Sequence, residues 1–192
     1  YTLRCLGFGG PNPEGKVMGL ASYGEPRFIN VFRDVLTISG NMDFQIDNRF
    51  FDLTQEGAFA LTSAFLDPLM LPREEDEELT QHHMDVAASL QLRLEEVGIQ
   101  MARDLHNATG SENLCLSGGV ALNSVMNKKI VDQTPFRRVF IQPASDDGGT
   151  PLGAALAIKH LVLSSRRLTL WSGPYVGATY DRDEIQSLLD ER

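Results

Sequence analysis

The stretch Asn113-Leu-Cys-Leu-Ser-Gly-Gly-Val-Ala-Leu-Asn123 decides the fold, because a short apolar run ends in two glycines and leads into a helical pattern. The run Asn113–Leu116 is predicted to be a buried strand, and residues 120–130 a helix. A second strand at Arg138–Ile141 and a second helix over 153–163 repeat this order. Strands and helices that alternate at this spacing predict an α/β unit with a parallel pair of strands.

The glycine pair after the first strand is a candidate binding site. Gly118 and Gly119 allow a ligand to approach the backbone, and free amides at the start of a helix favour an anion such as phosphate. A tight strand-to-helix turn without a ligand uses similar residues, so both interpretations stay open. Asn123 suits a ribose or a base, and it can equally bond the backbone locally.

A second candidate site follows the second strand, at Gln142-Pro-Ala-Ser-Asp-Asp-Gly-Gly-Thr150. Parallel strands end at the same edge of a sheet, so we expect the two loops to face one cleft. The adjacent acids Asp146 and Asp147 can hold a divalent cation, although Asp-Gly pairs are also common in turns. One carboxylate is a poor metal site, so further ligands would have to come from elsewhere.

The remaining segments are predicted from periodicity and turn residues. The strongest is a helix over 84–105, whose apolar residues recur every three or four positions and form one stripe: Val86, Leu90, Leu94, Val97, Met101 and Leu105. We also expect a β-hairpin turning near Gly40 (residues 31–39 and 44–46), short helices over 57–66 and 181–189, and a solvated charge run over 73–78.

Composition excludes several classes of function. The 192 residues carry 17 basic and 26 acidic side chains, a net charge of −9, which argues against unassisted binding to nucleic acid or to an anionic membrane. Cys5 and Cys115 lie far apart and suggest neither a zinc site nor a disulfide framework, and Cys115 is expected to be buried in its strand. We therefore expect a cytoplasmic protein, and the start at Tyr1 within an apolar pattern suggests a fragment.

Two weaker signals are rejected. Gly10-Pro-Asn-Pro-Glu-Gly-Lys16 approaches a Walker A loop, but Val17 replaces the required hydroxyl residue and the prolines remove backbone donors. Lys16 can still contact a phosphate or an acidic group. The four histidines have no metal-binding spacing and are interpreted as polar helix residues: His82, His83, His106 and His160.

Four motifs, in order, resemble one family, the nodulation-protein-type O-carbamoyltransferases. They are Glu14-Gly-Lys-Val-Met-Gly-Leu-Ala-Ser-Tyr-Gly24, Met84-Asp-Val-Ala-Ala-Ser-Leu-Gln91, the stretch from Asn113 to Asn123, and Gln142-Pro-Ala-Ser-Asp-Asp-Gly-Gly-Thr-Pro-Leu-Gly-Ala-Ala155. The resemblance implies α/β architecture: the second ribonuclease-H-like half of an actin-like ATPase (ASKHA) domain over 1–165, with a mixed sheet flanked by helices. Residues 166–192 would be a linker and the start of a C-terminal domain.

The resemblance also implies a reaction and its residues. In this family carbamoyl phosphate and ATP give carbamoyladenylate, and the carbamoyl group passes to a hydroxyl of a small molecule at a metal, commonly iron (Fe2+). The nucleotide- or substrate-binding motif positions are Gly7, Lys16, Gly118, Gly119 and Asn123, and Asp147 matches the metal ligand. Many members have glycine where this chain has Asp146, and none of its histidines matches the family's metal-binding histidines.

Two alternatives remain beside the carbamoyltransferase hypothesis. The chain can be a non-catalytic nucleotide-binding or scaffold module, or a phosphoryl-transfer enzyme of the same fold that releases ADP. The expected partners are carbamoyl phosphate, a hydroxylated acceptor, and the N-terminal half and C-terminal domain of the same protein. No residue is nominated as a catalytic acid or base.

Overall fold

A computed structural model describes residues 1–10, 13–52, 54–55, 60–73, 76–167 and 177–191. The chain divides into two compact units, Tyr1–Asp146 and Asp147–Arg192. The expected domain boundary after residue 165 stays a prediction. Among the described residues, no helix combines the length and the apolar character that crossing a membrane requires.

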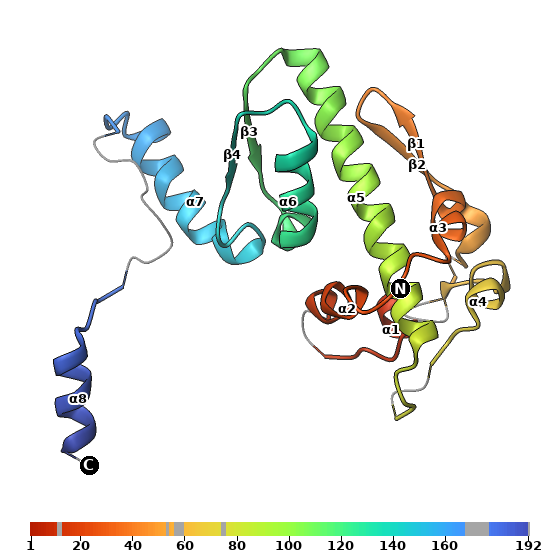
Figure 1. Ribbon diagram of the computed structural model, residues 1–192. Coiled ribbons are helices and arrows are strands. Elements are labelled where there is room, and N and C mark those ends of the chain that lie inside the picture. The colour runs from red at the N-terminus through yellow and green to blue at the C-terminus, as the bar shows by residue number, and fades with distance from the viewer. Residues whose placement is uncertain (11–12, 53, 56–59, 74–75, 168–176, 192) are drawn as a thin grey trace. The chain divides into compact units, whose positions relative to one another are not determined.

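The first unit is a mixed α/β structure in which two small sheets and several helices surround one long helix (Figure 1). Its elements in chain order are α1 (Thr2–Cys5), α2 (Glu14–Ala21), α3 (Ile29–Val35), β1 (Leu36–Gly40), β2 (Asp43–Ile46), α4 (Ser63–Leu69), α5 (Gln81–Thr109), β3 (Asn113–Leu116), α6 (Ser124–Gln133) and β4 (Arg138–Ile141).

Helix α5 is the axis of this unit. Its N-terminal half packs into one hydrophobic cluster with α1 to α4, and its C-terminal half packs into a second cluster with β3 and α6. The predicted helix over 84–105 is confirmed and is longer at both ends. Thr80 and His83 form a reciprocal cap at its start, and Gly110 ends it in the left-handed region, with φ of 63°.

The parallel pair is confirmed. β3 pairs with β4 in register, with Leu114 opposite Val139 and Cys115 opposite Phe140. Leu114 and Val139 face the second cluster, whereas Phe140 is 51% exposed. The expectation that Cys115 is buried is wrong, because successive side chains of a strand point to opposite faces and Cys115 lies on the exposed one.

The hairpin near Gly40 is confirmed in part. β1 and β2 pair antiparallel, and Asn41 and Met42 both have positive φ (55° and 63°), as the tight turns of hairpins require. Residues 31–35 are helical rather than extended, because the Phe32 ring is buried against Phe65, with 5.8 Å between the ring centroids.

The expected single mixed sheet is not present in the described part of the chain. The antiparallel pair and the parallel pair are separate two-stranded sheets, because α5 lies between them (Figure 1). Arg93 and Asp104 bond the antiparallel hairpin, whereas Ile99 and Ala102 pack against the parallel pair. The predicted helix over 120–130 is also divided. Gly119–Leu122 is a 3₁₀ turn, and α6 begins only after Asn123, whose ψ of 92° interrupts the helix.

Two predictions in the connecting segments need correction. The short helix lies at Ser63–Leu69, later than the predicted 57–66, and residues 57–59 of that prediction lie outside the described residues. In the charge run over 73–78, Arg73 is buried, with 7% of its surface exposed. Its guanidinium donates hydrogen bonds to backbone carbonyl groups, which offset the cost of burying it.

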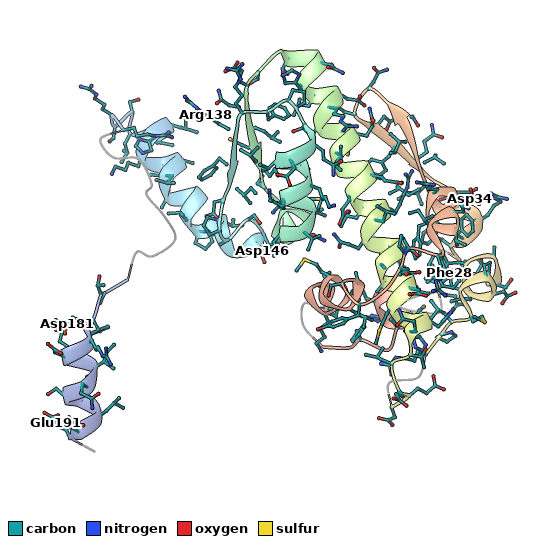
Figure 2. The ribbon with its side chains drawn as sticks, viewed as in Figure 1. Phe28, Asp34, Arg138, Asp146, Asp181 and Glu191 are labelled. Atoms are coloured by element: carbon teal, nitrogen blue, oxygen red, sulfur yellow. The ribbon has the colours of Figure 1, made fainter. Side chains whose placement is uncertain are left out.

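The segment after α2 lies directly against the backbone of α5 and is bonded to two of its side chains. A Cβ on Gly24 would lie 2.0 Å from the carbonyl oxygen of Met84, so only glycine fits there. The Glu25 N–H donates to Asp85 (2.8 Å), and the Phe28 N–H donates to the buried Ser89 hydroxyl (3.0 Å; Phe28 is labelled in Figure 2). The bond from the Glu25 N–H is the main reason that the pKa of Asp85 lies below its usual value.

The second unit contains a 3₁₀ turn at Asp147–Gly149, helix α7 (Thr150–Ala157), a π-helical turn at Ile158–Val162, and helix α8 (Arg182–Asp190). The predicted helices over 153–163 and 181–189 are confirmed. Asp181 caps α8 by accepting a hydrogen bond from the Glu184 N–H, which accounts for its start.

Gly24→Ala is expected to destabilise the protein by at least about 2 kcal/mol, because the added methyl group must displace the α5 backbone. The matched control is Gly19→Ala in α2, where nothing lies within 4 Å of the added Cβ. Alanine favours the helix there, and we expect a gain of up to about 1 kcal/mol. Urea unfolding of both variants measures the difference, and equal stabilities would contradict the close approach at Gly24.

Candidate functional site

The glycine turn after β3 lies at the carboxyl end of the parallel pair. Gly118 has φ of 95° and ψ of 163°, a conformation that side chains disfavour, and nothing lies within 4 Å of where its Cβ would be. Its N–H donates to the carbonyl oxygen of Ser145 (2.7 Å), which ties this turn to the loop after β4. Gly119 is exposed and begins the 3₁₀ turn. The structure thus brings together the backbones of the two loops that the sequence analysis singled out.

Asn123 has a structural role in this turn. Its Oδ1 atom caps α6 by accepting from the Met126 N–H (2.9 Å). It also forms a reciprocal amide pair with Gln91 of α5, with bonds of 2.8 and 3.1 Å. These bonds use both lone pairs of Oδ1 and one N–H of Nδ2. The structure therefore favours the local interpretation of Asn123, and contact with a ribose or a base stays a prediction.

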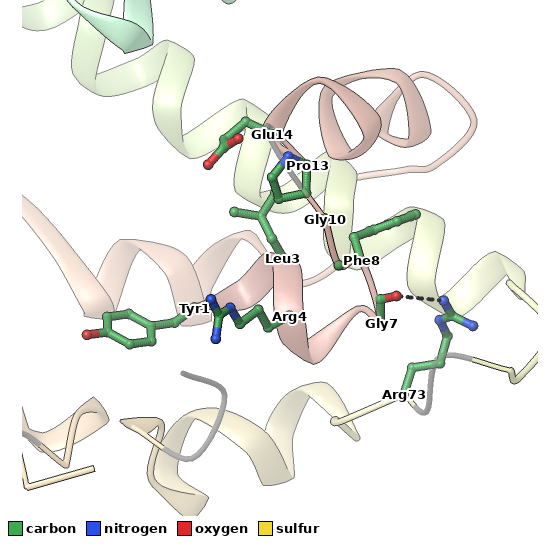
Figure 3. Close-up of a pocket in the computed structure, with 10 residues that line it drawn as sticks. Tyr1, Leu3, Arg4, Gly7, Phe8, Gly10, Pro13, Glu14 and Arg73 are labelled. Carbon is green, nitrogen blue, oxygen red and sulfur yellow. Dashed lines mark hydrogen bonds between the residues drawn. The ribbon is translucent and has the colours of Figure 1, made fainter. Parts of the chain in front are cut away.

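Gly7 lines a cavity of about 540 Å³ (Figure 3). The other lining residues are Tyr1, Leu3, Arg4, Phe8, Gly9, Gly10, Pro13, Glu14 and Arg73. Arg73 closes one side: its Nε donates to the carbonyl oxygen of Leu6 (2.7 Å), and its guanidinium would lie 2.6 Å from a Cβ on Gly7. Sequence reasoning missed Arg73, because it begins an acidic run that is typical of solvated segments.

Cys5 and Lys16 lie before and after the glycine-rich loop in the sequence, and they differ in exposure: Cys5 is buried and Lys16 is exposed. Lys16 is exposed in the first turn of α2, where it is accessible to a ligand, but it is not among the residues that line the cavity. Helix α1, not a strand, precedes the loop, which agrees with the rejection of a Walker A site. Burial raises the pKa of the Cys5 thiol, so Cys5 is a core residue rather than a nucleophile.

Asp147 is exposed at the start of the second unit. Within the described residues, no group of three or more histidine, cysteine, aspartate or glutamate side chains is placed to hold a metal ion. His82 and His83 instead contact backbone or side-chain atoms around the start of α5, as polar helix-start residues do. The described residues alone do not form a metal site, and the assignment of Asp147 stays a prediction.

Gly7→Ala is expected to destabilise the protein more than Gly10→Ala. Both glycines have positive φ (74° and 87°), so alanine costs about 1–2 kcal/mol in backbone strain at either position. Only at Gly7 must the Arg73 guanidinium also move, which adds about 1–3 kcal/mol of overpacking. Chemical denaturation measures the difference, and equal losses would show that Arg73 does not constrain the turn.

Asn123→Ala is expected to cost about 2 kcal/mol or more, because it removes the α6 cap and leaves the Gln91 amide without its partner. Asn123→Ser keeps a capping oxygen and loses only the Gln91 pair, so it should cost less. Thermal unfolding of both variants measures this. If serine and alanine destabilise equally, the cap contributes nothing to stability.

Comparison with known proteins identifies the family. The family model described as "Carbamoyltransferase N-terminus" matches residues 2–156. The chain is 37% identical over 161 residues to nodulation protein NolO of Bradyrhizobium diazoefficiens (82% of this chain, 27% of the relative). It is 33% identical over 196 residues to nodulation protein NolNO of Sinorhizobium fredii (98% and 26%).

A third relative extends the comparison beyond the nodulation proteins. An uncharacterized protein of Synechocystis is 35% identical over 189 residues, which are 95% of this chain and 31% of the relative. The chain thus spans about a quarter to a third of the length of these three relatives. Because the family model covers most of the chain, including the glycine turn and the loop after β4, the chain belongs to the carbamoyltransferase N-terminus family.

Proposed function

We propose that the chain is part of an O-carbamoyltransferase built on an actin-like ATPase fold, of which it forms the second ribonuclease-H-like half. The observation that carries this proposal is the family match over 2–156, which includes all four motifs. The relatives named as nodulation proteins support the same assignment. The parallel pair, with a glycine turn at its carboxyl end, is compatible with a nucleotide site at that edge.

The proposed reaction moves a carbamoyl group from carbamoyl phosphate, by way of carbamoyladenylate made with ATP, to a small-molecule hydroxyl. In the transfer step, the hydroxyl oxygen bonds to the carbamoyl carbon and the bond from that carbon to the AMP oxygen breaks. AMP departs and the hydroxyl proton is released. Because AMP is a good leaving group, the step requires no strong general acid.

Each predicted site residue has a part in this proposal. The exposed backbone around Gly118 and Gly119 approaches the phosphate, since no side chain obstructs it there. Gly7 lines the cavity that we assign to the adenosine, and Lys16 is an accessible cation nearby in the sequence. Asn123 fixes the end of the turn, because its side chain bonds Gln91 of α5 and caps α6. The cytoplasm is the proposed location.

The proposed reaction also involves a divalent metal, which is iron in the family that the sequence resembles. Asp147 offers one carboxylate, and the described residues supply no cluster to complete its coordination. We assign Asp147 as one ligand of a site whose other ligands lie outside the described residues. A metal in such a site would polarise the carbamoyl carbonyl.

The full-length protein is expected to release AMP when it is given carbamoyl phosphate, ATP and a panel of hydroxylated acceptors. Chromatography of the nucleotides distinguishes the alternatives. Release of ADP without AMP would favour a phosphoryl-transfer enzyme, and nucleotide binding without release of either would favour a scaffold module. The 192-residue chain alone is the matched control and should release no AMP, because it supplies only part of the site.

A further inference from the structure

Two buried polar side chains of α5 are bonded in series to the end of the glycine turn. Asn123 Nδ2 donates to Gln91 Oε1 (2.8 Å), and Gln91 Nε2 donates to Asn123 Oδ1 (3.1 Å). The other hydrogen of Gln91 Nε2 goes to Glu95 Oε1 (2.9 Å), four residues further along the helix. Gln91 and Glu95 are more than nine-tenths buried, with 9% and 8% of their surfaces exposed.

The two ends of this network differ in the hydrogen bonds that they can form. The Glu95 carboxylate only accepts hydrogen bonds, and the Met126 N–H, which donates to Asn123 Oδ1 (2.9 Å), only donates. If the Gln91 amide were reversed, its oxygen would face the Glu95 carboxylate. The Asn123 amide would have to reverse with it, which would turn Nδ2 toward the Met126 N–H. The two amides therefore fit in one orientation, which Glu95 fixes from the α5 side.

Asn123 connects this network to the glycine turn. Its backbone N–H donates to the carbonyl oxygen of Val120 (3.0 Å), which closes the 3₁₀ turn Gly119–Leu122. At the start of the turn, the Gly118 N–H donates to the carbonyl oxygen of Ser145 (2.7 Å). The turn is thus held at its start by the loop after β4 and at its end by the α5 network.

We propose that Gln91 and Glu95 are positioning residues for the phosphate of the bound nucleotide. They hold Asn123 in one orientation, and Asn123 sets the exposed backbone of the glycine turn for that phosphate. Backbone N–H groups bind an anion best when their directions are fixed in advance, because ordering them on binding costs free energy. The inference rests on the proposed function, which assigns the phosphate to this turn, and adds two buried residues that act through Asn123.

The alternative is that the network only stabilises the fold. Both explanations predict a lower melting temperature when the network is broken, so stability alone does not separate them. A network that only stabilises leaves the affinity of the folded protein for every nucleotide unchanged. A network that positions the turn affects only ligands that carry a phosphate. AMP and adenosine separate the two explanations, because they differ by that phosphate.

The test is calorimetry of the full-length protein with AMP and with adenosine, well below the melting temperature of each variant. Gln91→Met removes the amide at similar size, and Glu95→Leu removes the carboxylate. Glu95→Gln keeps an oxygen that can accept from Gln91. The matched control is Gln100→Met, because Gln100 Nε2 donates to Asp104 (2.8 Å) at the same four-residue spacing on α5.

We expect the wild type and Gln100→Met to bind AMP more tightly than adenosine. Gln91→Met and Glu95→Leu should weaken AMP binding about tenfold, the effect of losing one hydrogen bond to a charged group, and leave adenosine binding unchanged. Glu95→Gln should retain most of the affinity for AMP. In a protein that already carries Asn123→Ser, Gln91→Met should cause no further loss, because it acts through Asn123.

Unchanged AMP binding by Gln91→Met and Glu95→Leu, or equal losses for AMP and adenosine, would overturn the positioning role and leave the proposed function intact. A further tenfold loss from Gln91→Met in the Asn123→Ser background would do the same. If the wild type binds neither ligand, the positioning role and the proposed function are contradicted together.

Discussion

The contact of Gly24 with the backbone of α5 is the constraint on which the first unit depends. Because residue 24 has no side chain, the segment 24–28 lies against the first turns of α5, close enough for Asp85 and Ser89 to accept its N–H groups. The Ser89 hydroxyl in turn donates to the carbonyl oxygen of Asp85 (2.6 Å). Buried polar groups are thus paired within a few ångströms of the close approach, which fixes where α2 ends and α3 begins.

The same helix carries the second half of the unit through a second polar contact. Gln91 lies two residues, about half a turn, beyond Ser89, and its amide is held between Glu95 (2.9 Å) and Asn123. Asn123 caps α6, so the start of α6 is positioned by a side chain of α5 as well as by β3. A displacement of α5 would therefore disturb the N-terminal cluster and the glycine turn together.

Local patterns were sufficient to predict the elements whose cause is local. The two strands of the parallel pair have the predicted bounds, because three successive apolar residues before a turn leave little choice. The sequence-based predictions were wrong where a contact with a residue distant in the sequence determines the local structure. Residues 31–35 are helical because Phe32 packs against Phe65, and Arg73 is buried because the carbonyl of Leu6 accepts its guanidinium. Sequence spacing does not show such contacts.

From the sequence, the candidate site could be predicted only as two loops at one edge of a sheet. The roles of the individual residues in those loops could not be predicted. Asn123 has its partner 32 positions away in α5, which no local pattern reveals.

Two of the family motifs are joined by buried polar contacts. Around Gly24, Asp85 and Ser89 the buried polar groups are paired, as stability requires. The segment from Gly24 to Phe28 lies against α5 because Gly24 has no side chain and because Asp85 and Ser89 accept its N–H groups. The motif that ends at Gly24 and the motif at the start of α5 therefore depend on each other, although some sixty positions separate them in the sequence.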